Sequence, residues 1–368
     1  MRIEKAIVRH VEMPLKFRFR TSFGETTVKR FLLLELRSEG VSGWGECVAE
    51  EGPFFSPETV ATASEMLRRF LLPLVVGRDV AGPEEFAGAA RKVRGNRMAK
   101  GAVDAALWDL RARREGVSLA RALGGTKEAV EVGVSLGIAP TVPELIANVR
   151  RHVEQGYRRI KLKIEPGLDV ERVAAVRAEF PGIVLTVDAN AAYGLADWKT
   201  LAALDAFGLD YIEQPLSHED LVQHAELARR IETPICLDES IRSADDAEAA
   251  IELGAAKVIN VKIGRVGGLT ESLAIHRVAF ASGIPLWCGG MLESGVGRAH
   301  NVAIASLAGF SRPGDTSSSS RYFDEDVVSP QLEATGGLMP VPKGPGSGVS
   351  IRHDVLAKVT DALEEFDA

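Results

Sequence analysis

Five polar residues recur at a nearly constant spacing in segments that otherwise read as short buried strands. They are Lys163, Asp188, Glu213, Asp238 and Lys262; the first four lie 25 residues apart, and the last follows after 24. One strand–helix unit of a compact parallel barrel takes about that much chain, so each residue is predicted at the corresponding level of successive strands. The carboxyl ends of such strands form the active-site face of a barrel.

The chain from about residue 128 alternates between short apolar segments and helical ones, which is typical of parallel strand–helix units. Their number over about 200 residues favours a closed α/β barrel of the TIM type, over residues 126–339, above an open doubly wound sheet. No G-x-G-x-x-G follows the first strand, which weakens a dinucleotide-binding alternative. The predicted strands are VEVGVSLGI, RRIKLKI, IVLTVDAN, DYIEQPL, TPICLDES, AKVINVKIG and IPLWCGG.

Residues 1–125 read differently, as strands followed by helices, and predict an α+β unit. Two strand-like runs meet at Glu39-Gly40, a hairpin signal. Helical spacing of apolar residues follows in MAKGAVDAALWDLRARREG. The stretch FRFRTSFGETTVKR between the first two strands is interpreted as a surface loop or a mobile lid over a site. The tail, about 340–368, is expected to return to this first unit as loop plus a short strand.

The three carboxylates make an expensive cluster if they share one strand end, since no arginine lies in those strands to compensate them. A hard divalent cation such as Mg²⁺ resolves this cost, because it takes oxygen ligands and leaves positions for a substrate oxyanion. The alternative is that each carboxylate caps a helix or pairs with a lysine. Glu239, next to Asp238, points to the other side locally and is expected to support the site or cap a helix.

Lys163 and Lys262 flank the carboxylates, one strand before and one strand after them. Strand alternation places Lys161 on the same face as Lys163, and Asn260 on the same face as Lys262. A lysine pair around a metal suggests general acid–base work at a carbon next to a carboxylate. Arg265, in VKIGRVGG, either tunes Lys262 or faces solvent.

Composition narrows the setting. The net charge of −7 gives no electrostatic case for nucleic acid or an anionic membrane as partner. No apolar run approaches the roughly 20 residues of a membrane helix, and the N-terminus MRIEKAIVRH does not read as a signal peptide. Cys47, Cys236 and Cys288 are too few and too scattered for a disulfide framework, so a cytoplasmic protein is expected.

At these residues the sequence resembles the enolase superfamily, muconate-lactonizing-enzyme subgroup, over nearly its whole length. The KLK, VDAN, IEQP, LDES and VKIGRVGG elements match in order and spacing. The resemblance implies an α+β capping domain over a (β/α)₇β barrel. It also implies Asp188, Glu213 and Asp238 as ligands of Mg²⁺, which Mn²⁺ or another divalent cation can replace, and Lys163 and Lys262 as the acid/base pair. This superfamily is itself a known example of a lysine base working with Mg²⁺ on an enediolate. The resemblance further suggests a symmetric homo-oligomer.

A closer resemblance is to the o-succinylbenzoate synthase / N-succinylamino acid (N-acylamino acid) racemase family, carried by GVSLGI, GYRRIKLKIEPG, GGMLESGVGRAHN, PGDTSSSSRY and GLMPVPKGPG. The GGMLESG segment separates the chain from dipeptide epimerases, which carry an Asp-x-Asp pair there. Candidate residues for binding a small carboxylate substrate are Phe19, Phe23, Ser135, Lys161, Asn190, Gly290, Met291 and Leu292. The two phenylalanines could equally serve ordinary interdomain packing.

Two reactions are implied, and they share one intermediate type. A synthase would remove the α-proton and eliminate water to give o-succinylbenzoate, a menaquinone precursor. A racemase would exchange protons on opposite faces of an N-acylamino acid. Muconate cycloisomerase, with the same scaffold and lysines, is the alternative within enzymes, and a non-catalytic ligand-binding barrel is the alternative outside them.

Overall fold

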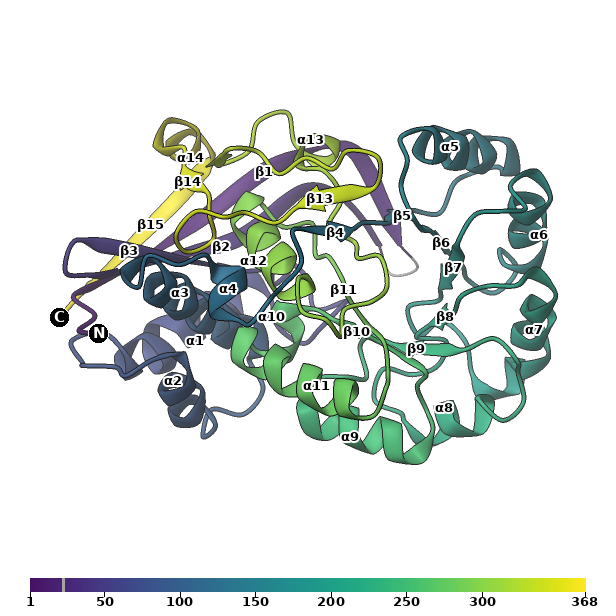
Figure 1. Cartoon of the computed structure of the whole chain (residues 1–368), viewed down its shortest axis with the longest axis horizontal. Helices are drawn as coiled ribbons and strands as arrows, with labels where there is room; N and C mark the ends of the chain where they lie inside the picture. Colours follow the sequence, from purple (N-terminus) through teal and green to yellow (C-terminus); the bar gives the residue numbers. More distant parts are fainter. Residues whose placement is uncertain (22–23) are drawn as a thin grey trace.

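The computed structural model of the chain describes residues 1–21 and 24–368. It has two parts: a four-stranded antiparallel sheet with helices packed on it, and a seven-stranded parallel sheet with helices along its outer side (Figure 1). The first part is a separate capping domain, and its longest strands reach over one end of the parallel sheet.

The capping sheet has the order β15-β1-β2-β3. Its strands are β1 (Lys5–Thr21), β2 (Gly24–Ser38), β3 (Val41–Cys47) and β15 (Thr360–Asp367). Both turn residues between β2 and β3, Glu39 and Gly40, have positive φ, as a tight hairpin turn requires, so the hairpin signal is confirmed. The helical segments beside this sheet are α1 (Val60–Met66), η1 (Leu67–Leu71), η2 (Leu72–Leu74), α2 (Pro83–Ala90) and α3 (Arg97–Arg114).

The interpretation of residues 17–30 as a loop is wrong for the described residues. β1 and β2 continue through this stretch as a long antiparallel ribbon, with Phe19 paired to Thr26 and Thr21 to Gly24. Alternating aromatic and charged residues suit a two-sided ribbon, which explains the extended pairing. The pairing shifts between Pro14 and Phe19, where β1 carries extra residues that bend it.

The parallel sheet runs in the order β11-β10-β9-β8-β7-β6-β5, so consecutive strands along the chain are neighbours. All seven predicted apolar segments contain a strand of it. The strands are β5 (Val134–Leu136), β6 (Ile160–Lys163), β7 (Leu185–Asp188), β8 (Ile212–Glu213), β9 (Ile235–Leu237), β10 (Val258–Val261) and β11 (Leu286–Cys288).

Helices connect these strands and cover the outer side of the sheet (Figure 1). The helical segments between β5 and β11 are α5 (Val142–Glu154), α6 (Val170–Glu179), η3 (Leu195–Asp197), α7 (Trp198–Ala203), η4 (Leu204–Phe207), α8 (Val222–Leu227), α9 (Ala244–Leu253), α10 (Ile263–Val266) and α11 (Leu269–Ala281). The remaining helices are α4 (Leu119–Ala122), α12 (Gly295–Ala305), α13 (Ser319–Tyr322) and α14 (His353–Val359).

The segment 309–315 lies between the two edge strands of the parallel sheet. On one side Asp315 N donates to Cys288 O (2.9 Å), and Leu286 N donates to Gly309 O (3.0 Å). On the other, Gly133 N donates to Gly314 O (2.7 Å). Backbone hydrogen bonds therefore link this segment to β11 and to the chain that enters β5.

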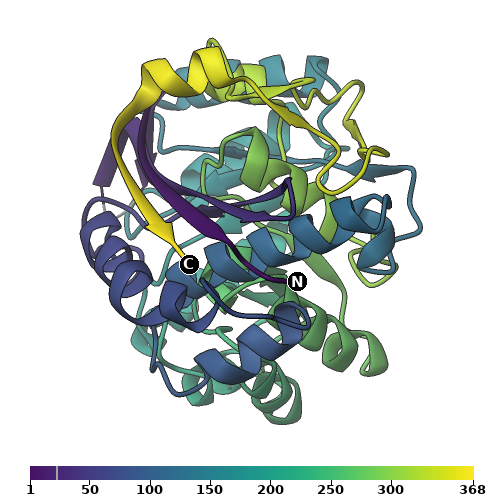
Figure 2. The same ribbon diagram turned by 90° about the vertical axis from the view of Figure 1, so that its left-hand side faces the viewer.

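The C-terminal tail returns to the capping domain, and it does so with more structure than a single short strand. Short pairs form first, between β13 (Leu338–Pro340) and β4 (Ala129–Glu131), and between β14 (Ser350–Ile351) and β12 (Val328–Ser329). β15 then lies antiparallel beside β1, and the two chain ends come close together (Figure 2).

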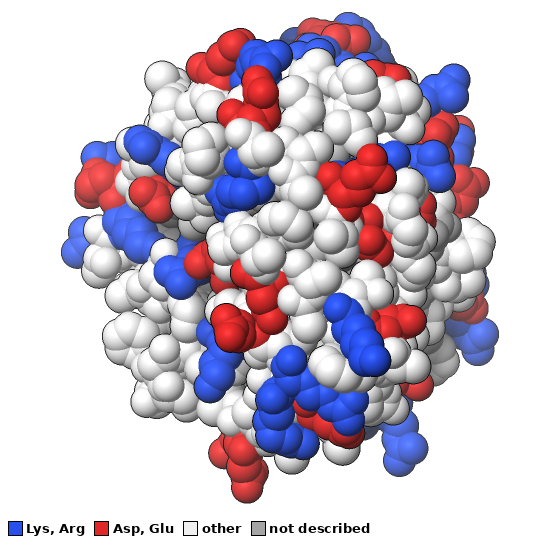
Figure 3. Space-filling view, turned by 90° about the vertical axis from the view of Figure 1, so that its right-hand side faces the viewer, with Lys and Arg blue, Asp and Glu red and all other residues white. Residues whose placement is uncertain are grey.

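Apolar side chains form two large cores, one inside and around the parallel sheet and one between the capping sheet and its helices. No helix among the described residues is both long and apolar enough to cross a membrane. On the face shown in Figure 3, lysine and arginine side chains lie interspersed with acidic ones, so neither sign of charge dominates it.

Candidate active site

The five periodic residues all lie at or just beyond the carboxyl ends of neighbouring parallel strands. Lys163, Asp188 and Glu213 are the last residues of β6, β7 and β8, and they pair in register, Lys163 with Asp188 and Asp188 with Glu213. Glu213 pairs with Cys236 of β9, so Asp238 lies two residues beyond the position that is in register with Glu213. An offset of two preserves the side-chain face, so the carboxylates remain on one side of the sheet.

Each of the three carboxylates is buried and paired with basic side chains. Lys163 Nζ lies 2.6 Å from Asp188 Oδ2, Lys161 Nζ 2.7 Å from Glu213 Oε2, and Lys262 Nζ 2.8 Å from Asp238 Oδ2. Burial opposes ionisation of Asp188, but Lys163 and Lys161 outweigh it and hold the pKa of that carboxyl well below its usual value. Burial, with the nearby charge of Asp188, raises the pKa of Glu213.

The donor set suits a hard divalent cation, although the side chains are not arranged around one. Glu213 and Asp188 repel each other at close range, and all their donor atoms are oxygens, which Mg²⁺ prefers. Among the described residues, however, no three acidic, histidine or cysteine side chains converge as a metal site. The carboxylate oxygens contact lysine, arginine and amide groups instead.

Lys161 is the most heavily paired cation of the site. Its Nζ lies 2.7 Å from Glu213, 2.9 Å from Asp315 Oδ2 and 3.3 Å from Asp188, and 4.6 Å from the centre of the Trp287 ring. Burial works against the charge, but the three carboxylates raise the pKa of Lys161 well above its ordinary value. Lys161 therefore remains a fixed positive charge.

Arg265 is buried, so the alternative of a solvent-facing arginine is wrong. It belongs to the short α10, directly after Lys262, and its Nη1 contacts Asp238 Oδ1 while its Nε donates to Ile241 O (2.9 Å). The strands carry no arginine at this level, and Arg265 of the helical turn after β10 compensates the charge of Asp238 instead. Gly289 leaves room for Asn260 and Lys262, because a Cβ there would lie 2.3 Å from Asn260 Oδ1 and 2.8 Å from Lys262 Cγ.

Asn190 links Lys163 to Glu239. Lys163 Nζ donates to Asn190 Oδ1 (2.6 Å), and Asn190 Nδ2 donates to Glu239 Oε1 (3.0 Å). Glu239 is buried and does not cap a helix; its second oxygen has no partner within the described residues, and burial raises its pKa. Glu239 therefore supports the lysine through an amide rather than pointing away from the site.

The backbone beyond the strand ends is held in an unusual conformation. Asn190, Gln214 and Leu292 have φ of 43°, 37° and 58°, a region that residues other than glycine rarely adopt. Gln214 shows what holds it there: its buried Oε1 accepts from Asp238 N (3.0 Å) and from Ser240 N. Such strain is kept mainly at functional sites, where the surroundings over-determine it.

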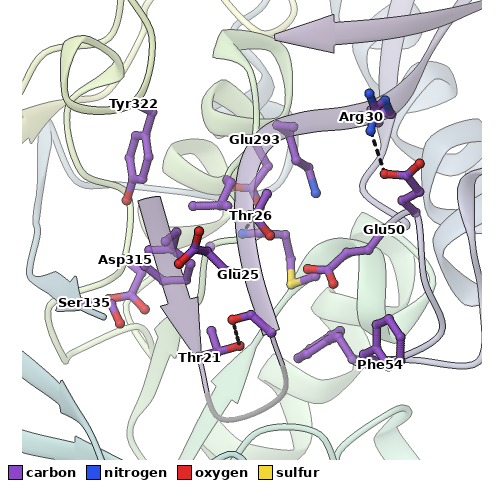
Figure 4. Close-up of a pocket in the computed structure, with 18 of the residues that line it drawn as sticks. Thr21, Glu25, Thr26, Arg30, Glu50, Phe54, Ser135, Glu293, Asp315 and Tyr322 are labelled. Atoms are coloured by element: carbon purple, nitrogen blue, oxygen red, sulfur yellow. Dashed lines mark hydrogen bonds and ion pairs between the residues drawn. The ribbon is translucent and has the colours of Figure 1, made fainter. Parts of the chain in front are cut away.

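A cavity of about 600 Å³ opens above these strand ends, between the parallel sheet and the capping domain. The capping domain contributes the tip of the β1–β2 ribbon and the segment 50–55, and Figure 4 shows Thr21, Glu25 and Thr26 of the ribbon facing Ser135, Asp315 and Tyr322 across it. Of the residues proposed from sequence, those that line the cavity are Lys163, Lys262, Phe19, Ser135, Lys161, Asn190, Gly290, Met291 and Leu292. Phe23 lies outside the described residues.

Sequence reasoning missed three contributors. Asp315 pairs with Lys161 and, at 2.8 Å, with the fully buried Arg159. Arg159 and Lys161 both lie over the ring of Trp287. The centre of the Phe55 ring, in the capping domain, lies 4.4 Å from Lys262 Nζ. The periodicity contained a signal for Asp315, since two further steps of about 26 residues beyond Lys262 reach it. Phe55 carries no such signal, because it belongs to the other domain.

Comparison with known proteins adds independent evidence. The chain matches the family description "Mandelate racemase / muconate lactonizing enzyme, N-terminal domain" over residues 3–124 and "Enolase C-terminal domain-like" over residues 144–355. It is 54% identical to an N-succinylamino acid racemase of Thermus thermophilus, covering 98% of both chains, and 52% identical to an o-succinylbenzoate synthase of Geobacillus kaustophilus, covering 99% of this chain and 97% of that one.

A solved structure of an enolase superfamily member from Listeria innocua superposes with a TM-score of 0.96, at 44% identity and with 100% of this chain and 99% of that one covered. A muconate cycloisomerase of Rhodococcus opacus is more distant, at 31% identity over 94% of this chain and 95% of the relative.

Proposed function

This chain belongs to the mandelate racemase / muconate lactonizing enzyme family of enolase-like proteins, and on that premise we propose that it is an N-succinylamino acid racemase and o-succinylbenzoate synthase. The observation that carries the proposal is the pairing of two lysines with the outer carboxylates of one strand-end array. Lys163 contacts Asp188 on one side, Lys262 contacts Asp238 on the other, and both line one cavity.

Asp188, Glu213 and Asp238 are the residues that would hold a divalent cation, Mg²⁺ in the first instance and Mn²⁺ or another as a substitute. When bound, the cation would bind the substrate carboxylate and offset the negative charge that develops on it. The buried repulsion between Asp188 and Glu213 supports this assignment. The lysine contacts of these carboxylates would loosen as the cation takes their oxygens.

Lys163 and Lys262 would perform the proton transfers. In the racemase reaction, one lysine removes the α-proton of an N-acylamino acid from one face, and the other returns a proton to the opposite face. In the synthase reaction, Lys163 removes the α-proton and water leaves from the same face, while Lys262 stays protonated and stabilises the anion.

Lys161 would stabilise the same anion as a permanent cation, since its three carboxylate partners keep it charged. Asn190 and Glu239 would position Lys163, and Arg265 would position Asp238 beside Lys262. Phe19, Ser135, Gly290, Met291 and Leu292 would shape the pocket around the substrate side chain and acyl group. Phe23 is proposed for the same role from the sequence alone.

Exchange of the α-proton tests the racemase role. Each enantiomer of N-succinylphenylalanine is incubated in D₂O with the Mg²⁺-loaded enzyme, and exchange is followed by NMR. We expect both enantiomers to exchange and interconvert. Lys163→Ala and Lys262→Ala should each abolish racemisation, and each should remove exchange from a different enantiomer, because each lysine serves one face.

The exposed Lys199→Ala is the matched control and should behave as wild type. Turnover of the hydroxylated cyclohexadiene precursor to o-succinylbenzoate tests the synthase role in parallel. Failure of the wild-type enzyme on both substrates, with turnover of cis,cis-muconate, would replace this proposal by the cycloisomerase alternative. Full activity of both lysine variants would contradict a catalytic barrel.

We further propose that the parallel sheet closes into a (β/α)₇β barrel, in which the segment 309–315 takes the place of the eighth strand. Its hydrogen bonds to β11 and to Gly133 support this closure.

The domain limits proposed are 1–125 with the tail 340–368, and 126–339 for the barrel. The buried, unpaired state of all three cysteines supports a cytoplasmic setting. A homo-oligomer remains proposed from family resemblance, and light scattering tests it.

A further inference from the structure

A second cavity, of about 810 Å³, lies on the other side of the β1–β2 ribbon from the proposed active site. Its walls come from the far half of β1, from the loop after β5, from α5, and from the segments 318–321 and 333–337. Figure 1 shows α5 and α13 near the end of β1 that forms this wall. Nothing in the proposed reaction uses this cavity.

The lining of this second cavity is strongly basic, although the chain carries a net charge of −7. Among the lining residues that the structure describes, Glu333 alone is acidic, and its Oε2 accepts a hydrogen bond from Ser320 Oγ (2.6 Å). The cationic lining residues, here called the basic groove, are Lys16, Arg18, Arg20, Arg151 and Arg321.

Two of these arginines have free guanidinium groups. Within residues 1–21 and 24–368, no hydrogen bond or ion pair reaches the side chain of Arg20 or Arg151, and both are exposed. Arg18 has a loose acidic partner, with its Nη1 3.6 Å from Glu25. Lys16 Nζ lies 3.7 Å from Asp324 and donates a hydrogen bond to Ser320 O (3.0 Å). The guanidinium groups of Arg18, Arg20 and Arg151 are therefore available to a ligand.

Arg321 is held in place from several sides. Its Nη2 donates to Ser135 O (2.9 Å), its Nη1 donates to Tyr322 Oη (2.7 Å), and its guanidinium lies 4.9 Å from the centre of the Phe17 ring. Beside it, the pKa of His152 is lowered to about 4, mainly by burial and to a smaller extent by the charges of Arg321 and Arg151. The groove thus combines an arginine that is held in place with exposed arginines on neighbouring elements.

We propose that the basic groove is a binding site for a small organic phosphate bearing two or more negative charges. Guanidinium groups bind phosphate oxygens through paired hydrogen bonds, and four of the five cations are arginines. Positive charges from three separate elements around one cavity suit a ligand with more than one anionic group. The site is distinct from the strand-end carboxylates and does not depend on the proposed reaction.

The β1 ribbon is a wall shared by the two cavities. Phe19 and Thr21 line the proposed active site, whereas Lys16, Arg18 and Arg20 line the basic groove. From Arg18 to Thr21 this division follows the alternation of a strand, in which successive side chains point to opposite faces. Phe17, next to the shift in pairing, also lines the groove. A ligand in the groove would therefore restrain the ribbon that covers the substrate cavity.

Fructose 1,6-bisphosphate is a suitable probe, because it has two phosphates and no carboxylate. Binding to the Mg²⁺-loaded protein is measured by calorimetry. We expect saturable binding that weakens with added salt, and a loss of affinity of at least tenfold in Arg20→Gln/Arg151→Gln. Arg229→Gln, an exposed arginine outside both cavities, is the control and should bind as wild type.

Three results would overturn the proposal: no saturable binding, equal binding by the double variant, or loss of binding in Lys163→Ala, which would place the ligand in the other cavity. Tight binding of the tricarboxylate tricarballylate without binding of the bisphosphate would overturn the assignment to phosphate. Hydrogen exchange supplies a second readout. Amides of residues 16–21 should exchange more slowly with the bisphosphate bound, and unchanged exchange there would contradict occupancy of the groove.

Discussion

Two lysines on the same face of β6, two residues apart, are placed in very different surroundings. Lys161 contacts three carboxylates, whereas Lys163 contacts Asp188 and the amide oxygen of Asn190. Several fixed anions around one ammonium stabilise its charged form and oppose proton loss. Lys161 is therefore suited to the role of a fixed positive charge, which agrees with the proposal, made from strand position and family resemblance, that Lys163 exchanges the proton.

Glu213 is predicted to be essential for the metal. Glu213→Gln removes a negative charge from the middle of the carboxylate array, so metal affinity should fall by about 100-fold or more and turnover should be lost. Mg²⁺ or Mn²⁺ titration by calorimetry and an activity assay check both. EDTA should abolish wild-type activity and added Mg²⁺ should restore it. The exposed Glu219→Gln should match wild type, and a fully active Glu213→Gln would overturn the metal assignment.

Asp315 is predicted to be a stability determinant as well as a site residue. Asp315→Asn leaves Arg159 and Lys161 buried with less compensation, so the free energy of unfolding should fall by about 3 kcal/mol. Urea unfolding measures the change. Asp79→Asn, at an exposed pair with Arg2, should change stability by less than about 0.5 kcal/mol. Equal stability of the two variants would show that the buried network is not needed.

At the scale of elements, helices near the domain boundary are capped by carboxylates from other elements. Glu46 of β3 accepts from Ser294 N (3.1 Å), Ser294 Oγ (2.6 Å) and Gly297 N (3.0 Å) at the start of α12, where Asp326 also accepts from Gly295 N. A carboxylate at a helix N-terminus satisfies amides that the helix leaves unpaired. The capping domain is thereby joined to the helix that follows β11.

Glu46 should make stability depend on pH. Burial is the main cause that raises its pKa to about 7 from 4.5, against the hydrogen bonds from Ser294. Between these values the folded state holds a proton that the unfolded state has lost, so the free energy of unfolding falls as pH rises from about 4.5 to 7. The fall attributable to this group is about 3 kcal/mol.

Urea unfolding at pH 5 and pH 7.5 measures this effect. Glu46→Gln should reduce the pH dependence, with the part due to Asp104 remaining, whereas Glu39→Gln, at an exposed pair with Arg114, should leave it as in wild type. Identical pH dependence in Glu46→Gln and wild type would mean that Glu46 is ionised throughout the range. The buried Asp104, with its pKa also raised to about 7 by burial, would then account for the remaining slope.

At the scale of the whole molecule, the last strand of the chain pairs with the first. β15 lies along β1 with seven paired positions, from Lys5 with Asp367 to Val11 with Thr360, and so covers an edge of the capping sheet. An uncovered edge strand exposes backbone groups that recruit other chains. The last residues of the chain are therefore part of the domain that roofs the proposed active site.

Truncation tests this dependence. Ending the chain after residue 359 should lower the thermal unfolding midpoint and promote association, measured by calorimetry and light scattering. Removing only residues 367–368 keeps most of the pairing and should have little effect. A truncated protein with an unchanged midpoint and no added association would show that β15 contributes nothing to stability.

Local periodicity determined the main architecture. Strand alternation and the length of one strand–helix unit are properties of the backbone, so spacing alone identified the parallel strands and placed Lys163, Asp188 and Glu213 at their ends. The same reasoning failed for the β1–β2 ribbon, because its polar composition resembles a loop and its pairing depends on contacts across the hairpin.

Only the tertiary structure decided how the charges are paired and what covers them. The stagger between neighbouring strands places Asp238 two residues beyond the register of Glu213. Contacts between distant segments bring Arg265 to Asp238, Asp315 to Lys161, and Phe55 of the capping domain to Lys262. Ion pairing depends on a few ångströms between side chains, whereas spacing along the chain specifies only the face and the level. The sequence by itself therefore determined which strand-end residues lie together at one end of the parallel sheet. The fold decided which of them touch and which residues from distant segments join them.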